Sequence, residues 1–402
     1  YPYCFPLQRR RNQHKYIADS KMTLITRYLV SDLLRKIFII TFGFTVLFSF
    51  FSFITELENL NTYEIKLEKI FYSQILNAPS IIYDVIPIAT LVGSLWCFAS
   101  LAANSEFVVF FGSGFSTRHF IKVILTGGIP IVILTIFLSE IIMPSSINKL
   151  NKISSGGRPY QTIELQTGYW IRDVLNYEKI ENNANERIIN IGQIDFDKKL
   201  SSILVYEFDK QNKLIRKITA KTGLFQKNNM ADEGVFFYSW SLAKPTILDM
   251  SEPTSITEKQ FDNIILSTNI SESTFNALTI KPEKMSAQEL RSYVAYLEES
   301  NQDANSYEIL FWKRIVYPSL IWIMLLIATP AAFIQTRGGN IGIKIFVGVL
   351  FGIFFHLLNG LVSHLGVLNT WPPSVIAFFP PISALVIGLL LLVQSQRFAL
   401  LK

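Results

Sequence analysis

The chain has 402 residues, of which 50% are hydrophobic and only 17% charged, and its formal net charge is +6. Because average globular proteins carry about a quarter charged residues, this composition favours a membrane protein over a soluble enzyme. The modest basic excess fits the cytoplasmic loops of such a protein better than nucleic-acid binding. The two cysteines, Cys4 and Cys97, give neither a disulfide framework nor metal-ligand spacing.

The N-terminal region is basic and then becomes amphipathic. Residues 1–21 are rich in arginine and lysine and precede Met22, so we interpret them as an N-terminal extension and leave them out of the predicted fold. Residues 24–36 place apolar side chains among basic ones. This pattern is typical of a lead-in helix at the inner membrane surface, or equally of the first turns of the next helix.

Six apolar segments each approach the roughly 20 residues that a helix needs to cross a bilayer. The predicted spans are residues 37–55, 81–103, 123–143, 315–333, 345–365 and 375–393. Asp84 and Pro87 lie near the start of the second span, so we expect its outer end to be irregular or to line a polar cavity. Basic residues are concentrated in the loops on one side, which predicts that both termini are cytoplasmic and the large middle region is outside.

The middle region, residues 162–280, has the composition of a β-domain. Short segments rich in Ile, Val, Phe and Tyr alternate with polar turns, which predicts an antiparallel sandwich or jelly roll. The predicted strands are 186–195, 201–208, 213–220 and 234–242. The domain contains no histidine, no cysteine and no convincing pair of acids, so a binding or scaffolding module is favoured over an enzyme.

The predicted organisation is therefore three domains after the extension. Residues 22–161 hold the first three spans, residues 162–280 the β-domain, and residues 281–402 a linker helix and the last three spans. Ser286 and Glu289 form a capping-box pattern at the start of that linker helix.

The sequence contains no phosphate-binding loop of the G-x-x-x-x-G-K-[ST] type and no H-E-x-x-H metal motif, so neither ATP binding nor a metal is assigned to this chain. Glycines at 348 and 352 form a small-xxx-small face for close helix contact, within the chain or between subunits. Phenylalanines in spans one and five either line an apolar cavity for acyl chains or face lipid; they are Phe48, Phe51, Phe351 and Phe355.

The loop between spans two and three predicts a short helix that starts at Glu106. Asn104 or Ser105 caps it, and Gly112 and Gly114 end it. We expect it to expose apolar side chains towards the cytoplasm; they are Phe107, Val108, Phe110 and Phe111. Such a surface needs a protein partner or rests in lipid headgroups.

Taken together, the chain resembles the LptF/LptG permeases of the lipopolysaccharide exporter, most closely the LptG type. The stretches that carry the resemblance are 22–28, 105–109, 114–116, 306–318, 337–352 and the Pro372-Pro373 turn. The order of three spans, a β-domain and three spans adds to it.

The resemblance implies a multi-pass inner-membrane permease subunit, without cofactor or catalytic residues, that pairs with an LptF-type permease above a cytoplasmic ATPase dimer. The pair would pass lipopolysaccharide through a periplasmic β-jellyroll to a bridge protein. The helix at Glu106 would couple to the ATPase, with the residues Glu106, Phe107, Phe110, Phe111, Gly114 and Arg118. The alternative is a membrane scaffold or sensor that transports nothing.

The chain departs from the family where relatives carry lysines near the lipid phosphates. The corresponding positions are Ser52, Glu58, Asn59 and Ser80, none of them basic. Phosphate contacts are therefore predicted elsewhere, at Lys313 and Arg314 first, with Lys66, Lys69, Lys149 and Lys152 as further candidates. Alternatively these residues are ordinary interfacial anchors.

Overall fold

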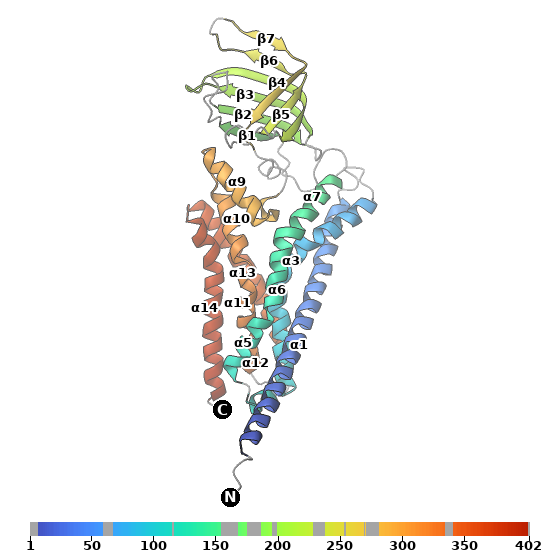
Figure 1. The fold of residues 1–402 in the computed structure, drawn as a ribbon, viewed down its shortest axis with the longest axis vertical. Coiled ribbons are helices and arrows are strands. Elements are labelled where there is room, and N and C mark those ends of the chain that lie inside the picture. Colours follow the sequence, from blue (N-terminus) through green and yellow to red (C-terminus); the bar gives the residue numbers. More distant parts are fainter. Residues whose placement is uncertain are drawn as a thin grey trace. The chain divides into compact units, whose positions relative to one another are not determined.

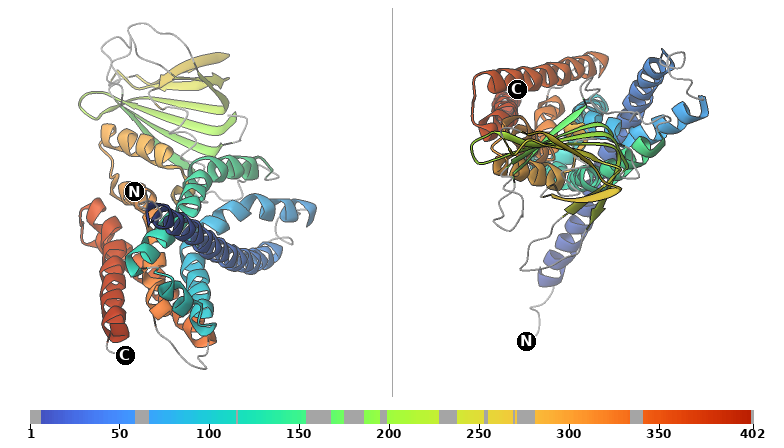
Figure 2. Two further views of the ribbon diagram at one scale, coloured as in Figure 1. Left: turned by 60° about the horizontal axis from the view of Figure 1, so that its bottom comes forward. Right: turned by 90° about the horizontal axis from the view of Figure 1, so that it is seen from above.

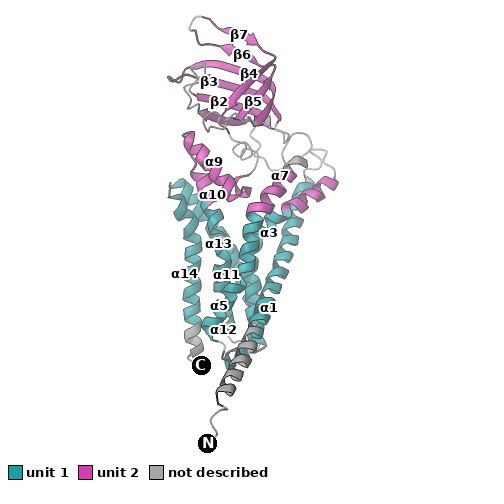
Figure 3. Cartoon of the chain, viewed as in Figure 1, with its two compact units in different colours: residues 1–57, 78–139, 312–402 teal, residues 58–77, 140–311 magenta. Residues whose placement is uncertain are grey.

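The computed structural model describes residues 7–58, 67–114, 116–153, 168–174, 186–194, 199–227, 238–252, 255–268, 270, 281–333 and 341–400. The chain forms two compact units (Figure 3). One unit is helical and comprises residues 1–57, 78–139 and 312–402; the other comprises residues 58–77 and 140–311 and holds the β-sheet. The predicted domain boundary at residues 161 and 162 lies outside the described residues.

The helical unit is built from long apolar helices (Figure 1). Its elements are α1 (Leu7–Glu58), α3 (Leu67–Ala103), α4 (Glu106–Gly112), α5 (Thr117–Gly127), α6 (Ile129–Phe137), α11 (Ser319–Ala328), α12 (Pro330–Phe333), α13 (Ile341–Leu368) and α14 (Pro373–Leu400). Among the described residues, five helical stretches are long and apolar enough to cross a membrane, or six if a bent pair forms one span. The predicted membrane-helical class is confirmed.

α1 and α14 lie on opposite sides of this unit (Figure 2). α14 packs against α11, α12 and α13, and α11 also contacts α5 and α6. α1 is one continuous helix through residues 24–36, so these residues are part of the first long helix and not a separate lead-in helix. Leu29, Leu33 and Ile37 on α1 are buried, while many apolar side chains between Phe38 and Ile54 of this helix are exposed.

Two spans depart from a straight helix. α10 (Asn305–Val316) and α11 meet at a 56° bend. Pro318 lies at this bend, where it provides no N–H and its ring disfavours a continuous helix. The third span contains the π-helical turn η1 (Leu138–Ile142). The irregular outer end predicted for the second span is not seen, since α3 stays helical through Pro79 and Pro87.

Glycines allow the helices of this unit to approach closely. The predicted face on α13 packs against α3 within the chain, with Gly348 against Leu95 and Gly352 against Ile88. The tightest backbone approach lies elsewhere: a Cβ at Gly93 of α3 would be 2.7 Å from the Ile37 Cα atom of α1.

We expect Gly93→Ala to destabilise the protein by about 1–3 kcal/mol, because the added methyl group meets backbone that cannot rotate away. Gly43→Ala is the matched control, since a Cβ there has nothing within 4 Å. It should be neutral or stabilising by up to about 1 kcal/mol. Thermal unfolding of the purified protein in detergent measures both, and equal shifts of the two variants would contradict the close α1–α3 contact.

The second unit contains an antiparallel sheet. In the described residues it has eight strands: β1 (Tyr169–Val174), β2 (Glu186–Ile194), β3 (Lys199–Phe208), β4 (Leu214–Lys227), β5 (Tyr238–Ala243), β6 (Thr246–Asp249), β7 (Thr257–Gln260) and β8 (Asn263–Thr268). β5 and β6 both pair with β4. β8 pairs with β5, and β7 pairs with β6. β5 and β6 together therefore act as one long strand with one interruption, and β7 and β8 act as a second. The predicted antiparallel β-domain is confirmed, and the sandwich or jelly roll is refined to one sheet of sequentially connected strands in the described residues.

One face of this sheet changes from apolar to charged along its strands. An aliphatic cross-strand row consists of Ile171, Ile189, Val205, Ile218 and Ile247. Two residues along, a charged row of alternating sign consists of Asp173, Arg187, Glu207, Arg216 and Asp249. Because successive residues of a strand point to opposite faces, both rows lie on the same face. The charged row thus borders the apolar core of the domain.

Helical elements of the same unit accompany the sheet: α7 (Met143–Ile153), η2 (Pro282–Lys284) and α9 (Ala287–Glu299). The predicted capping box is confirmed, because the Ser286 hydroxyl accepts from the Glu289 N–H at 3.2 Å while the Glu289 carboxylate accepts from the Ser286 N–H at 2.8 Å. α9 buries Leu290, Tyr293 and Leu297.

Candidate coupling site

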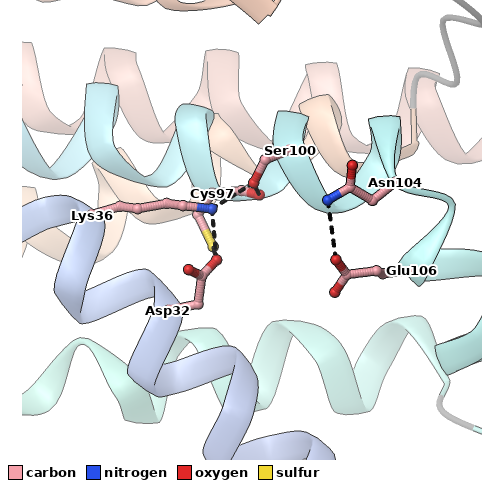
Figure 4. A network of polar contacts seen from close by, with 6 residues as sticks. All are labelled: Asp32, Lys36, Cys97, Ser100, Asn104 and Glu106. Atoms are coloured by element: carbon pink, nitrogen blue, oxygen red, sulfur yellow. Dashed lines mark hydrogen bonds and ion pairs between the residues drawn. The ribbon is translucent and has the colours of Figure 1, made fainter.

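The predicted short helix between α3 and α5 is present as α4. Left-handed backbone conformations bound it on both sides, with φ of 60° at Ser105 and 92° at Gly114. Glycine adopts such a conformation without the steric cost that a Cβ atom brings, which explains Gly114 at the end of the loop. At the start of the helix, Asn104 Nδ2 donates to Glu106 Oε1 at 3.3 Å (Figure 4).

Two phenylalanines of α4 point into the protein, so the predicted exposure of Phe107 and Phe110 is wrong. They are only 4% and 8% exposed. The Phe107 ring lies 5.2 Å from Phe120 of α5, and the Phe110 ring lies 6.5 Å from Tyr28 of α1. Residues three apart share one face of a helix, so the spacing of Phe107 and Phe110 is the signal in the sequence that could have indicated an anchoring face. The side chain of Phe111 lies outside the described residues.

The outward face of α4 is formed by two valines. Val108 is 54% exposed and Val109 is 68% exposed. Glu106 is half-buried, and Arg118 and Gly114 are exposed. The predicted coupling residues therefore divide into an anchored face and an open surface, and Val109 belongs to the open surface although the sequence prediction left it out.

A polar network joins α1 to α3 close to this loop (Figure 4). Lys36 Nζ donates to Asp32 at 2.7 Å and to the Ser100 hydroxyl at 2.5 Å. The Cys97 thiol donates to Asp32 at 3.3 Å, and Lys36 also lies 5.7 Å from the centre of the Trp96 ring. Because charges in an apolar helix bundle are costly unless they are partnered, this network fixes the pairing of α1 with the end of α3. Sequence reasoning missed the network.

The two residues preferred for phosphate contact have partners inside the helical unit. Arg314 is 8% exposed, and its guanidinium lies 4.8 Å from the centre of the Tyr83 ring. Tyr83 in turn stacks on Tyr317 at 4.3 Å. Lys313 Nζ donates to the Ser363 hydroxyl of α13. These contacts hold the bent span, α10 and α11, against α3 and α13. Because Arg314 is buried, it does not act as an interfacial anchor that keeps its charge in solvent.

Where the structure describes them, the remaining residues predicted to contact the lipid differ in exposure. Lys69 is half-buried in the other compact unit, and Lys66 lies outside the described residues. The phenylalanines predicted for an acyl-chain cavity are divided between two environments. Phe48 and Phe51 of α1 are 48% and 56% exposed, whereas Phe355 of α13 is 6% exposed and packs inside the helical unit. Phe351 is half-buried.

Comparisons with known proteins give one family. The model of the family described as lipopolysaccharide export system permease LptF/LptG matches residues 27–394. The chain is 27% identical over 326 residues to the lipopolysaccharide export system permease protein LptG of Escherichia coli strain K12, which covers 80% of this chain and 84% of that relative. It is 25% identical over 366 residues to the protein of the same name from Haemophilus influenzae, which covers 89% and 94%. Because the family match includes both groups of apolar helices and the β-sheet between them, the chain belongs to the lipopolysaccharide export system permease LptF/LptG family.

Proposed function

We propose that this chain is an LptG-type permease subunit of an ABC transporter that extracts lipopolysaccharide from the inner membrane and passes it to a periplasmic bridge protein. The family match over residues 27–394 carries this proposal. The chain itself hydrolyses no ATP; that reaction belongs to a cytoplasmic ATPase dimer, and an LptF-type permease completes the membrane part.

The proposed orientation places both termini and α4 in the cytoplasm and the β-domain in the periplasm. It rests on the basic residues of the loops that flank the spans. In this orientation α4 is the coupling helix. Its buried phenylalanines hold it on the protein, and Glu106, Val108 and Val109 meet the ATPase.

The lipid-binding part of the proposal uses the exposed apolar helices. α1 and α13 keep large apolar side chains exposed, among them Phe48, Phe51 and Phe354. We assign these surfaces to the partner permease and to lipid acyl chains. For the phosphates we retain Lys69 and Lys313, which are half-buried, together with Lys66, and we assign Arg314 to helix packing.

Co-purification tests the proposal against the alternative of a scaffold or sensor. The chain is purified from its native membranes, and we expect a stoichiometric nucleotide-binding subunit to accompany it. Glu106→Lys reverses the charge on the surface that we assign to the ATPase, so it should lower the recovered ATPase or uncouple hydrolysis from transport. Recovery without any nucleotide-binding subunit would favour the scaffold, and full assembly and transport by Glu106→Lys would contradict the role of α4.

A further inference from the structure

Glu140 is the one acidic residue of the third apolar helix, which spans Thr117–Leu150. It lies in the π-helical turn η1. An ionisable side chain in a membrane helix is costly and is usually retained for a function, and single π-helical turns are frequent at functional sites. Neither the coupling site nor the proposed lipid contacts use this residue.

The Glu140 carboxylate binds the first turn of another helix of the same unit. The Ala287 N–H donates to its two oxygens, at 3.3 Å and 3.1 Å. Ala287 is the first residue of α9. The first N–H groups of a helix lack partners within it and carry the positive end of the helix dipole, so a carboxylate is well suited there. The capping box occupies the Ser286 and Glu289 N–H groups, and Glu140 supplies an acceptor for the Ala287 N–H group, which lies between them in the sequence.

Farther along α9, a tyrosine binds the β-sheet. The Tyr296 hydroxyl donates to the Arg172 carbonyl oxygen of β1 at 2.6 Å, and its ring packs against the core of the sheet. Burial raises the pKa of the Tyr296 hydroxyl above its ordinary value, so the group remains a protonated donor. Tyr293 connects α9 to α10, because its ring lies 6.0 Å from Tyr296 and 4.6 Å from Tyr307.

These contacts form a continuous path from η1 through α9 to β1. Apolar packing contributes to holding α9 in place through the buried side chains of Leu290, Tyr293 and Leu297. The carboxylate adds a directional contact at one end of the helix, and the Tyr296 hydroxyl adds a second one to the strand. A displacement of η1 along the third helix would therefore be passed to β1 with α9 as the rigid element.

We propose that Glu140 is a positioning residue that links movement of the third membrane helix to the β-domain through α9. The inference rests on the proposed function, since it concerns how ATP-driven helix movement is converted into delivery of lipopolysaccharide to the β-domain. It concerns the outer half of the transporter and is independent of how α4 meets the ATPase.

The experiment uses the whole complex in proteoliposomes and measures ATP hydrolysis and lipopolysaccharide delivered to an acceptor bridge protein. Glu140→Ala should leave assembly and ATP hydrolysis within about twofold of wild type, whereas lipopolysaccharide delivered per ATP falls about tenfold, as expected for loss of one charge-assisted hydrogen bond. Glu140→Gln keeps a carbonyl acceptor for the Ala287 N–H and should recover at least half of the delivery. Tyr296→Phe removes only the hydroxyl at the other end of the path and should lower delivery per ATP like Glu140→Ala.

A purely structural role makes a different prediction: it would lower the yield of complex and ATP hydrolysis together and leave delivery per ATP unchanged, which would overturn the inference. Delivery per ATP at the wild-type level in Glu140→Ala, or a Glu140→Gln variant no better than Glu140→Ala, would overturn it as well. If Glu140→Ala yields no complex, Tyr296→Phe decides: wild-type delivery per ATP then refutes the path. A wild-type complex that delivers no lipopolysaccharide would instead refute the proposed function.

Discussion

Replacing Arg187 by alanine is expected to destabilise the β-domain by about 3–5 kcal/mol, the cost of breaking a buried ion pair from one side. Arg187 is 4% exposed, and it donates to Glu207 Oε1 at 2.7 Å and to the Ser267 carbonyl at 2.7 Å. Its removal leaves the Glu207 carboxylate, which is 1% exposed, with the longer contact to Arg216 at 3.4 Å.

Hydrogen exchange of β2 and β3 in the intact protein measures this effect as a loss of protection. Lys221→Ala is the control, because Lys221 is a basic residue on β4 with an exposed side chain, and it should change protection by less than about 0.5 kcal/mol. A double variant, Arg187→Met with Glu207→Leu, should lose less than the sum of the two single variants, since it leaves no unpaired charge at this pair. A loss below about 1 kcal/mol for Arg187→Ala would show that the charged row is not an interdependent network.

Val109→Asp is expected to lower the affinity for the ATPase about 30-fold or more. A carboxylate introduced at a desolvated contact costs about 2 kcal/mol or more, which corresponds to that factor. The side chain is 68% exposed in the chain by itself, so folding should be unaffected. Assembly of purified components, followed by titration of the ATPase, provides the measurement.

Ile256→Asp is the matched control for that variant. Ile256 is 70% exposed, so the same chemical change is made at an equally exposed apolar residue, but in the other compact unit. It should leave ATPase affinity unchanged. If Val109→Asp binds the ATPase as tightly as wild type, α4 rests on something other than the ATPase, and lipid headgroups become its partner.

The sequence was sufficient for the features that local pattern determines. Hydropathy located the membrane helices, and the capping residues located both α4 and the start of α9. Element ends and faces were harder. β7 was missed because all four of its residues are polar or charged and exposed, so the strand has no alternation of apolar and polar side chains. The direction of Phe107 was misjudged because apolar composition was considered without the helical period that puts it beside Phe110.

Contacts between distant segments could not be predicted from local patterns. Asp32 and Cys97 meet although 65 positions separate them, and Glu140 meets Ala287 across 147 positions. Lys313 and Arg314 looked like lipid contacts because their charges stand out near an apolar run. Their partners, Ser363 and the ring of Tyr83, become neighbours only when α10 packs against α13 and α3.

The central claim is that this chain moves lipopolysaccharide with energy from a partner's ATP hydrolysis. The most direct measurement is transfer of lipopolysaccharide from proteoliposomes that contain the purified complex to an acceptor outside them, with ATP added or withheld. The account predicts transfer that requires ATP and is lost when this chain is omitted from the complex. Transfer that is equal with and without ATP, or equal without this chain, would contradict it.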